Sequence, residues 1–206
     1  MEKRYFEKHL RRWESAALLA LCIALLAGVV AQGRAASVSR SLIRLHVLAA
    51  DDSPSEQAVK LEVRDAVLRY LLPLLAGVES ADEAGRILAG ELDGIRQAAQ
   101  SRAGERAVTV TLTNERYPTR DYAGFTLPAG AYRSLRVVLG EGKGRNWWCI
   151  VFPPVCLAAV QREQLRPVLR PEDYALITRE EGWELRFRSV ELWGELINRI
   201  EGWREK

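Results

Sequence analysis

The sequence predicts an α+β fold, a single domain that follows one N-terminal membrane segment. Residues 15–33 form an uncharged stretch of 19 residues that is long and apolar enough to cross a bilayer. Beyond it, segments with apolar residues at helical spacing are followed by segments in which every second residue is apolar. The predicted order is a strand, two helices, several strands and a final helix, without an internal repeat. We therefore expect a mixed or antiparallel sheet with about three helices in residues 42–206, a length suited to one domain.

The N-terminal region has the charge pattern of an exported protein. Residues 1–14 carry five Lys or Arg against three Glu and form a basic leader. As a helix, residues 15–33 would rise about 28 Å, close to the roughly 30 Å of a hydrocarbon core. Their eight Leu, Ile and Val residues favour insertion by about 2–5 kcal/mol in total. The positive-inside rule then predicts a cytoplasmic leader, a polar tether at 34–41 and an extracytoplasmic domain at 42–206.

The apolar segment has two alternative fates. The small residues at 29–31, Val-Val-Ala, have a spacing that a signal peptidase accepts. Residues 15–33 are therefore either a retained transmembrane helix or the core of a cleaved signal peptide. In both cases the domain leaves the cytoplasm, anchored by a single pass or secreted.

The first strand of the domain is predicted at residues 42–48. Ile43, Leu45 and Val47 fall on one side of this strand, and Arg44 and His46 fall on the other. Because that second side carries two basic residues, we expect His46 to be solvated.

Two helices are predicted after this strand. Ser53, Pro54 and Glu56 have the spacing of a capping box with proline at the first helical position, and Pro73 is expected to end this helix near residue 72. Apolar residues at helical spacing predict a second helix over 81–101, although three glycines there weaken it by about 1 kcal/mol each if they are interior.

The rest of the chain has mostly strand periodicity. Prolines 167 and 171 are expected to break any long helix within 158–178, and residues from 190 onward return to helical spacing. Alternation predicts strands at 108–113, 135–139 and 183–188. A continuous apolar and aromatic run predicts a buried strand at 147–152, and a further strand is predicted at 122–127.

Several function classes are disfavoured by composition and spacing. Thirty basic and 27 acidic residues give a net charge of only +3, and no basic stripe carries interleaved aromatics, so nucleic acid is not an expected partner. The glycine-rich loop at 140–144 has Gly144 after Lys143, where a phosphate-binding loop needs Ser or Thr. One histidine and two cysteines in the exported part do not form a zinc set. We therefore expect no cofactor and no metal.

Cys149 and Cys156 lie close together in the exported part, whereas Cys22 lies in the apolar segment. Outside the cytoplasm the close pair is a candidate disulfide that would contribute about 2 kcal/mol, and two buried thiols are the alternative. A free Cys149 could instead be the nucleophile of a cell-envelope hydrolase or transferase with His46 as base. No local motif connects these two residues, and we expect no catalytic site.

Two loop regions are rich in the residue types that dominate binding hot spots, and they are either a partner surface or part of the core. If they meet at one end of the sheet, they form a surface of Tyr, Trp and Arg. The candidate partner-binding residues are Tyr117, Arg120, Glu141, Lys143, Asn146, Trp147 and Trp148.

Three blocks of sequence resemble the stage II sporulation protein R family of endospore-forming bacteria. They are IRLHVLAADDSPSEQAVKLEVRDAVL at 43–68, YPTRDYAGFTLPAGAYRSLRVVLGEGKGRNWWCIVFPPVC at 117–156, and ELRFRSVELW at 184–193. The second block is long and unusual in composition. The resemblance is weaker at 73–106 and 158–182.

The resemblance implies a signalling protein rather than an enzyme. Members of the family are made in the forespore and exported across its membrane into the intermembrane space. There they trigger a membrane-embedded aspartic protease of the mother cell, which then processes pro-sigma-E. A membrane-tethered structural protein without a triggering role is the alternative that the membrane segment alone would also fit.

Overall fold

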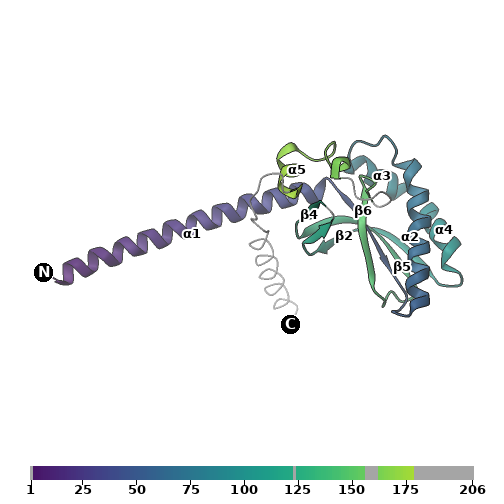
Figure 1. The fold of residues 1–206 in the computed structure, drawn as a ribbon, viewed down its shortest axis with the longest axis horizontal. Helices are drawn as coiled ribbons and strands as arrows, with labels where there is room; N and C mark the ends of the chain where they lie inside the picture. Colours follow the sequence, from purple (N-terminus) through teal and green to yellow (C-terminus); the bar gives the residue numbers. More distant parts are fainter. Residues whose placement is uncertain (1, 123, 156–161, 179–206) are drawn as a thin grey trace.

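The structure, a computed structural model, describes residues 2–122, 124–155 and 162–178 and confirms the predicted α+β class. A long helix leads into a four-stranded sheet with helices and a small hairpin around it (Figure 1). The elements in chain order are α1 (Glu2–Arg40), β1 (Ile43–Leu48), α2 (Pro54–Leu74), α3 (Ala81–Gly90), α4 (Leu92–Ala103), β2 (Val108–Tyr117), β3 (Arg120–Tyr122), β4 (Phe125–Leu127), β5 (Gly130–Leu139), β6 (Asn146–Phe152), the 3₁₀ turn η1 (Arg162–Leu165) and α5 (Pro171–Thr178).

The main sheet is mixed and has the strand order β2-β5-β1-β6. The central strand β1 is parallel to β5 and antiparallel to β6, and β2 is antiparallel to β5. All six residues of β1 are buried, so this strand is covered on both faces of the sheet.

One face of the sheet, here called the helical face, packs against α2, α3 and α4. Ile43, Leu45 and Val47 of β1 point to this face and are fully buried in a cluster with apolar residues of the three helices. These are the residues that alternation placed on one side of the strand. Burial of an aliphatic side chain contributes about 1.5–3 kcal/mol, which makes this cluster the larger source of stability.

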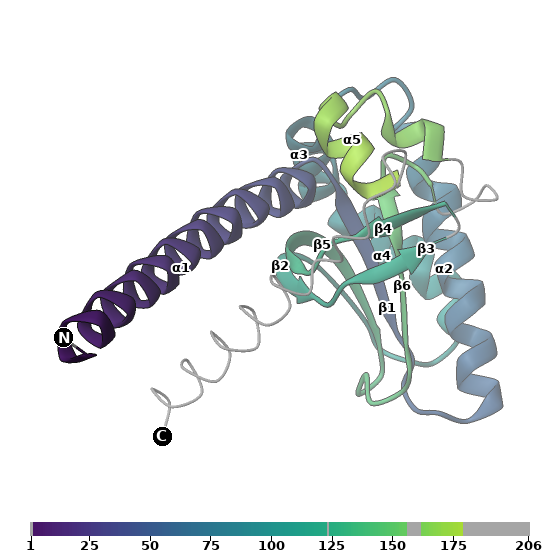
Figure 2. The same cartoon turned by 60° about the vertical axis from the view of Figure 1, so that its left-hand side comes forward.

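The opposite face, here called the polar face, is covered by smaller elements. The β3–β4 hairpin, α5 and the last turns of α1 pack there around a second cluster that includes Leu42, Tyr132 and Ile150. Figure 2 shows the hairpin and α5 on the side of the sheet away from α2. This face carries the polar residues that form the candidate site.

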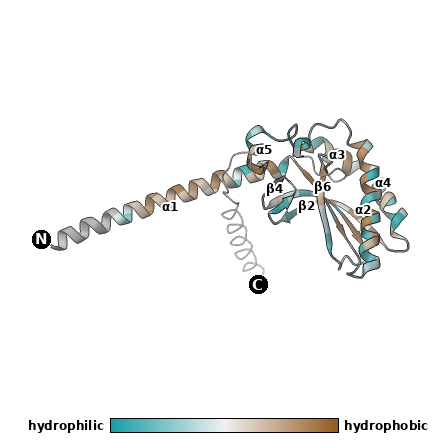
Figure 3. Cartoon of the chain, viewed as in Figure 1, coloured by the Kyte–Doolittle hydropathy of each residue, from teal (hydrophilic) through white to brown (hydrophobic). Residues whose placement is uncertain are grey.

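Helix α1 is one continuous helix of 39 residues. Its segment Trp13–Arg40 is the helix within the described residues that is long and apolar enough to cross a membrane, by length and composition. Figure 3 shows this segment as a hydrophobic band on the part of α1 that extends away from the domain.

The predicted tether at 34–41 differs from the structure, because α1 continues through it to Arg40. Ala35 and Val38 are buried in the domain, and the Ser37 hydroxyl donates a 2.6 Å hydrogen bond to the fully buried Asp173 of α5. Small polar and apolar residues at helical spacing let this segment dock instead of remaining extended. The helix therefore joins the domain through a packed contact.

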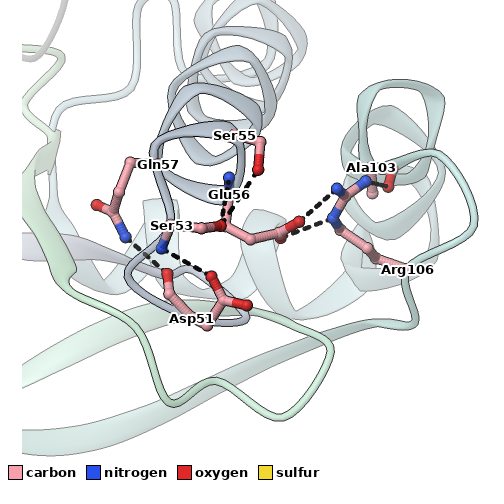
Figure 4. A network of polar contacts seen from close by, with 7 residues as sticks. All are labelled: Asp51, Ser53, Ser55, Glu56, Gln57, Ala103 and Arg106. Atoms are coloured by element: carbon pink, nitrogen blue, oxygen red, sulfur yellow. Dashed lines mark hydrogen bonds and ion pairs between the residues drawn. The ribbon is translucent and has the colours of Figure 1, made fainter.

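The start of α2 has the predicted cap. The Ser53 side chain accepts a hydrogen bond from the backbone N–H of Glu56, and Pro54 occupies the first turn. The Glu56 carboxylate does not reach back to the cap but accepts two hydrogen bonds from Arg106, at 2.7 and 2.5 Å (Figure 4). This ion pair connects the start of α2 to the chain after α4 and lowers the pKa of Glu56.

The predicted helix at 81–101 is split into α3 and α4 at Glu91, and the helix expected to end near residue 72 extends to Leu74 with Pro73 in its last turn. Two of the three glycines that weakened the second helix, Gly85 and Gly94, have a packing role. A Cβ on Gly94 would meet the Tyr70 hydroxyl of α2, and one on Gly85 would meet the Arg133 side chain. Their cost in helix propensity is offset by this close approach.

Other elements differ in extent. The strand predicted at 122–127 is the β3–β4 hairpin, and the strands predicted at 108–113, 135–139 and 147–152 are longer at one end. Pro171 begins α5 instead of breaking a helix, as proline can at a first helical position. The strand predicted at 183–188 and the helix from 190 lie outside the described residues.

We expect Ser53→Ala to lower the free energy of unfolding by about 1 kcal/mol, because it leaves a helix N–H without its acceptor. Ser55→Ala is the matched control, since its hydroxyl contacts only the Ser53 hydroxyl and caps no N–H among the described residues. Urea unfolding of the full chain in a neutral detergent measures both values. Equal stabilities of the two variants would contradict the capping role.

Candidate functional site on the polar face

The candidate site lies where four strands bring polar and aromatic side chains to the polar face. The residue alternation of each strand selects them, and the strand register aligns them across the sheet. The contributing residues are Arg44 and His46 of β1, Glu115 and Tyr117 of β2, Tyr132, Ser134 and Arg136 of β5, and Asn146 and Trp148 of β6.

Arg44 lies at the centre of this group and is fully buried. Its guanidinium carbon lies 3.9 Å from the ring centroid of Tyr117 and 5.2 Å from that of Tyr132. Its Nη2 donates a 2.8 Å hydrogen bond to the hydroxyl of Tyr122 in β3. Aromatic faces therefore surround the charge, and cation–π attraction partly compensates its desolvation.

The tyrosines around Arg44 remain neutral. Burial raises the pKa of Tyr117, Tyr132 and Tyr122 above the ordinary value, although the nearby Arg44 charge opposes the shift in each case. The positive charge of Arg44 is therefore not balanced by a tyrosinate. Within the part of the chain that the structure describes, no carboxylate forms an ion pair with Arg44.

His46 and Glu115 form the second polar contact of the face. The Nδ1 of His46 lies 3.1 Å from a Glu115 carboxylate oxygen, and its Nε2 lies 2.9 Å from Oδ1 of Asn146. Glu115 also accepts a 3.0 Å hydrogen bond from the Tyr117 hydroxyl and lies 3.6 Å from Arg136. These contacts hold the His46 ring in one orientation between β2 and β6.

The pKa of Glu115 reflects these surroundings. Burial alone would raise it, but hydrogen bonds from Ser134, Tyr117 and His46, together with the His46 charge, hold the pKa below its usual range. Glu115 is therefore ionised at neutral pH and is already engaged by its neighbours.

Arg120 and Trp148 form the outer edge of the site. The guanidinium carbon of Arg120 in β3 lies 4.5 Å from the Trp148 ring centroid. The Trp148 ring in turn lies 5.7 Å from His46 and 6.0 Å from Tyr117, measured between centroids. Arg120 is exposed and Trp148 is half-buried, so this pair is the accessible part of the polar face.

Four of the seven predicted partner-binding residues meet here, namely Tyr117, Arg120, Asn146 and Trp148. The other three lie elsewhere. The Tyr117 end of β2 pairs with the start of β5, whereas Glu141 and Lys143 follow the end of β5, about 30 Å away along the strand. These two residues are exposed and pair with each other.

Trp147 lies on the helical face, with Arg64 of α2 4.4 Å from its ring centroid. It is separated from the site because adjacent residues of a strand point to opposite faces. The two loops do not meet at one end of the sheet, because antiparallel pairing of β2 and β5 places them at opposite ends.

The alternative with Cys149 as nucleophile and His46 as base is disfavoured because the two residues lie on opposite faces of the sheet. Cys149 is buried on the helical face, opposite Leu45, whereas His46 points to the polar face. Cys149 is also disulfide-bonded. Its predicted partner Cys156 lies outside the described residues, so that pairing stays a prediction. In the described residues no group of three or more His, Cys, Asp and Glu could hold a metal ion.

Sequence reasoning missed the centre of the site. It placed Arg44 and His46 on one side of the first strand and expected His46 to be solvated, but both residues are buried. The β3–β4 hairpin covers this side, and no local pattern announces that cover. The usable signal was the shared alternation of polar residues on three predicted strands, which continues on β2 to Glu115 and Tyr117.

Comparisons with known proteins identify relatives of the domain. The profile of the stage II sporulation protein R family matches residues 39–162, more than half of the chain. Stage II sporulation protein R of Bacillus subtilis (strain 168) is 34% identical over 118 residues, which are 55% of this chain and 53% of that protein. The chain thus matches about half the length of this relative. No solved structure matches the chain.

The low pKa of Glu115 predicts an acid-dependent loss of stability. A carboxyl group whose pKa is lowered by folding stabilises the fold above its unfolded pKa, near 4.5, and this contribution disappears as the pH falls through the folded pKa. We expect Glu115→Gln to lower the free energy of unfolding at pH 7 by about 1–3 kcal/mol, because His46 loses a charged hydrogen-bond partner and Arg136 loses its ion-pair partner. At acid pH the variant and the parent converge.

Urea unfolding at pH 7 and at pH 3.5 measures this convergence. Glu105→Gln, which removes an exposed carboxylate between α4 and β2, is the control and keeps the pH dependence of the parent. A difference between Glu115→Gln and the parent that stays constant with pH would contradict the assignment.

Proposed function

The chain belongs to the stage II sporulation protein R family, and on this premise we propose that it is an exported signalling protein of sporulation. It passes from the forespore into the intermembrane space. There it binds the extracytoplasmic part of a membrane-embedded aspartic protease of the mother cell and triggers processing of pro-sigma-E.

The N-terminal helix supports export. An apolar segment preceded by a basic leader favours translocation of the chain on its C-terminal side, and α1 has the length and composition of such a segment. The Val-Val-Ala sequence at 29–31 lies before the docked turns that include Ala35 and Val38. A cleaved and an uncleaved chain therefore both retain the contact between α1 and α5.

The observation that carries the proposed contact is the accessible pair of the exposed Arg120 and the half-buried Trp148 on the polar face. Arg and Trp are enriched in binding hot spots because they combine a large desolvated area with directional polar contacts. Cation–π contact with Trp148 orders the Arg120 side chain in the free protein, so less side-chain entropy is lost on binding. We therefore place the protease contact at this edge of the sheet.

Triggering requires more than binding. A ligand shifts an equilibrium only by its difference in affinity for the two states, so the polar face must fit the active form of the protease better than the inactive form. A factor of about 100 in affinity, or roughly 2.7 kcal/mol, would convert a protease that is 1% active into one that is half active.

We expect Arg120→Ala and Trp148→Ala each to reduce pro-sigma-E processing at least tenfold at limiting ligand, because a hot-spot residue contributes about 1–2 kcal/mol or more to binding. The measurement is co-expression of the full chain with the protease and pro-sigma-E, followed by quantification of the processed product. Circular dichroism and thermal unfolding verify that both variants are folded.

Lys143→Ala and Trp147→Ala are the matched controls, since they remove a cation and a tryptophan from the opposite end and the opposite face of the sheet. Both controls should process at the parental rate. Full processing by folded Arg120→Ala and Trp148→Ala would refute the contact surface. A full chain that never increases processing would favour the membrane-tethered structural protein.

A further inference from the structure

The polar face contains buried N–H donors that have no acceptor. Nε and Nη1 of Arg44 and Nε1 of Trp148 lack a hydrogen-bond partner among the described residues. An unsatisfied buried polar group costs about 1–3 kcal/mol, and more when it is charged. Arg44 carries two such donors on a fully buried cation.

The charges around these donors are also unbalanced. Glu115, the carboxylate among the contributing residues of this face, is engaged by His46 and Arg136. Arg44 and Arg120 both lie close enough to Tyr122 to act on its hydroxyl electrostatically, and neither forms an ion pair with any described carboxylate. Within the described residues, two cations thus lie near one tyrosine without an ion-paired carboxylate.

We propose that Arg44 binds a carboxylate of the partner, supplied by an Asp or Glu side chain. This inference rests on the proposed function and identifies the chemistry of the contact. A planar carboxylate accepts two parallel hydrogen bonds from a planar guanidinium, and such charge-assisted bonds are about twice as strong as neutral ones. The aromatic rings of Tyr117 and Tyr132 fix the guanidinium in place.

Access to Arg44 is controlled by the β3–β4 hairpin. The neutral Tyr122 hydroxyl accepts a hydrogen bond from Nη2 of Arg44 but does not balance its charge. The Tyr122 ring stacks on Phe125, with 4.9 Å between the ring centroids. Arg120, two residues earlier in β3, is exposed and meets an incoming anion first. Movement of this hairpin would replace the Tyr122 hydroxyl on Arg44 by the carboxylate of the partner.

The proposal makes an unusual prediction for Arg44→Met. Because the variant removes an unsatisfied buried charge and keeps a side chain of similar length, the unfolding temperature should stay within about 2 °C of the parent or rise. Processing of pro-sigma-E in the co-expression assay should nevertheless fall at least tenfold. Arg116→Met is the control, since it removes an exposed charge from β2, and it should leave both properties unchanged.

Either of two results with Arg44→Met would overturn the proposal. Parental processing would show that no partner group needs the guanidinium. A fall in unfolding temperature of several degrees, together with lost processing, would show that Arg44 serves the fold.

A second measurement tests the anion site without the protease. The full chain in a neutral detergent is heated in about 100 mM sodium acetate and in sodium chloride of equal ionic strength. Acetate should raise the unfolding temperature by about 1–3 °C through binding to the folded state, and Arg44→Met should abolish this shift. Sodium phosphate is the third condition.

The outcomes separate this inference from the proposed function. An acetate shift that depends on Arg44 supports the carboxylate site even if the protease assay fails. No acetate shift in the parent chain, or a shift with phosphate alone, would overturn it even if Arg120→Ala loses activity.

Discussion

Complete burial of β1 on both faces of the sheet is the constraint on which the rest of the structure depends. On the helical face the buried β1 residues are aliphatic and pack in a mainly aliphatic cluster, which stabilises the fold by burial of apolar area. The polar face has basic residues at two positions of β1, Arg44 and His46, whose burial requires aromatic rings, a carboxylate and a covering hairpin. The two faces of β1 thus have different roles: the helical face stabilises the fold, and the polar face holds polar groups in place.

This division explains why the site occupies a sheet face and not a loop cluster. Strand register fixes Arg44, His46 and Glu115 relative to one another, so the polar groups are held by a rigid scaffold. Arg120 comes from the short hairpin and is the exposed part. The proposed entry of a partner group into the interior requires this hairpin to move. The docked end of α1, where Ser37 is hydrogen-bonded to Asp173, holds this scaffold at a defined position relative to the apolar helix.

Periodicity was sufficient to predict the fold class, the mixed or antiparallel sheet and the N-terminal apolar helix, because alternation and helical spacing are local signals. The cap at Ser53 was equally readable, since it depends on three neighbouring residues. The break between α3 and α4 at Glu91 could not be predicted, because it is fixed by packing of these helices against other elements.

Tyr117, Arg120 and Trp148 were selected by residue type, and they do meet in space. Lys143 lies at the other end of the sheet from Tyr117, which local patterns could not reveal because they do not give the strand order. The burial of Arg44 was also not predictable, because it depends on a hairpin some 80 residues later in the chain.

Site-specific photo-crosslinking in sporulating cells tests most directly which surface of this domain contacts the proposed protease. A photoreactive residue in place of Pro118, exposed between β2 and β3, should form a covalent adduct with the mother-cell membrane protease. The same residue in place of Lys143, at the opposite end of the sheet, should form none. An adduct from position 143 alone, or from neither position in a chain that still triggers processing, would contradict the account.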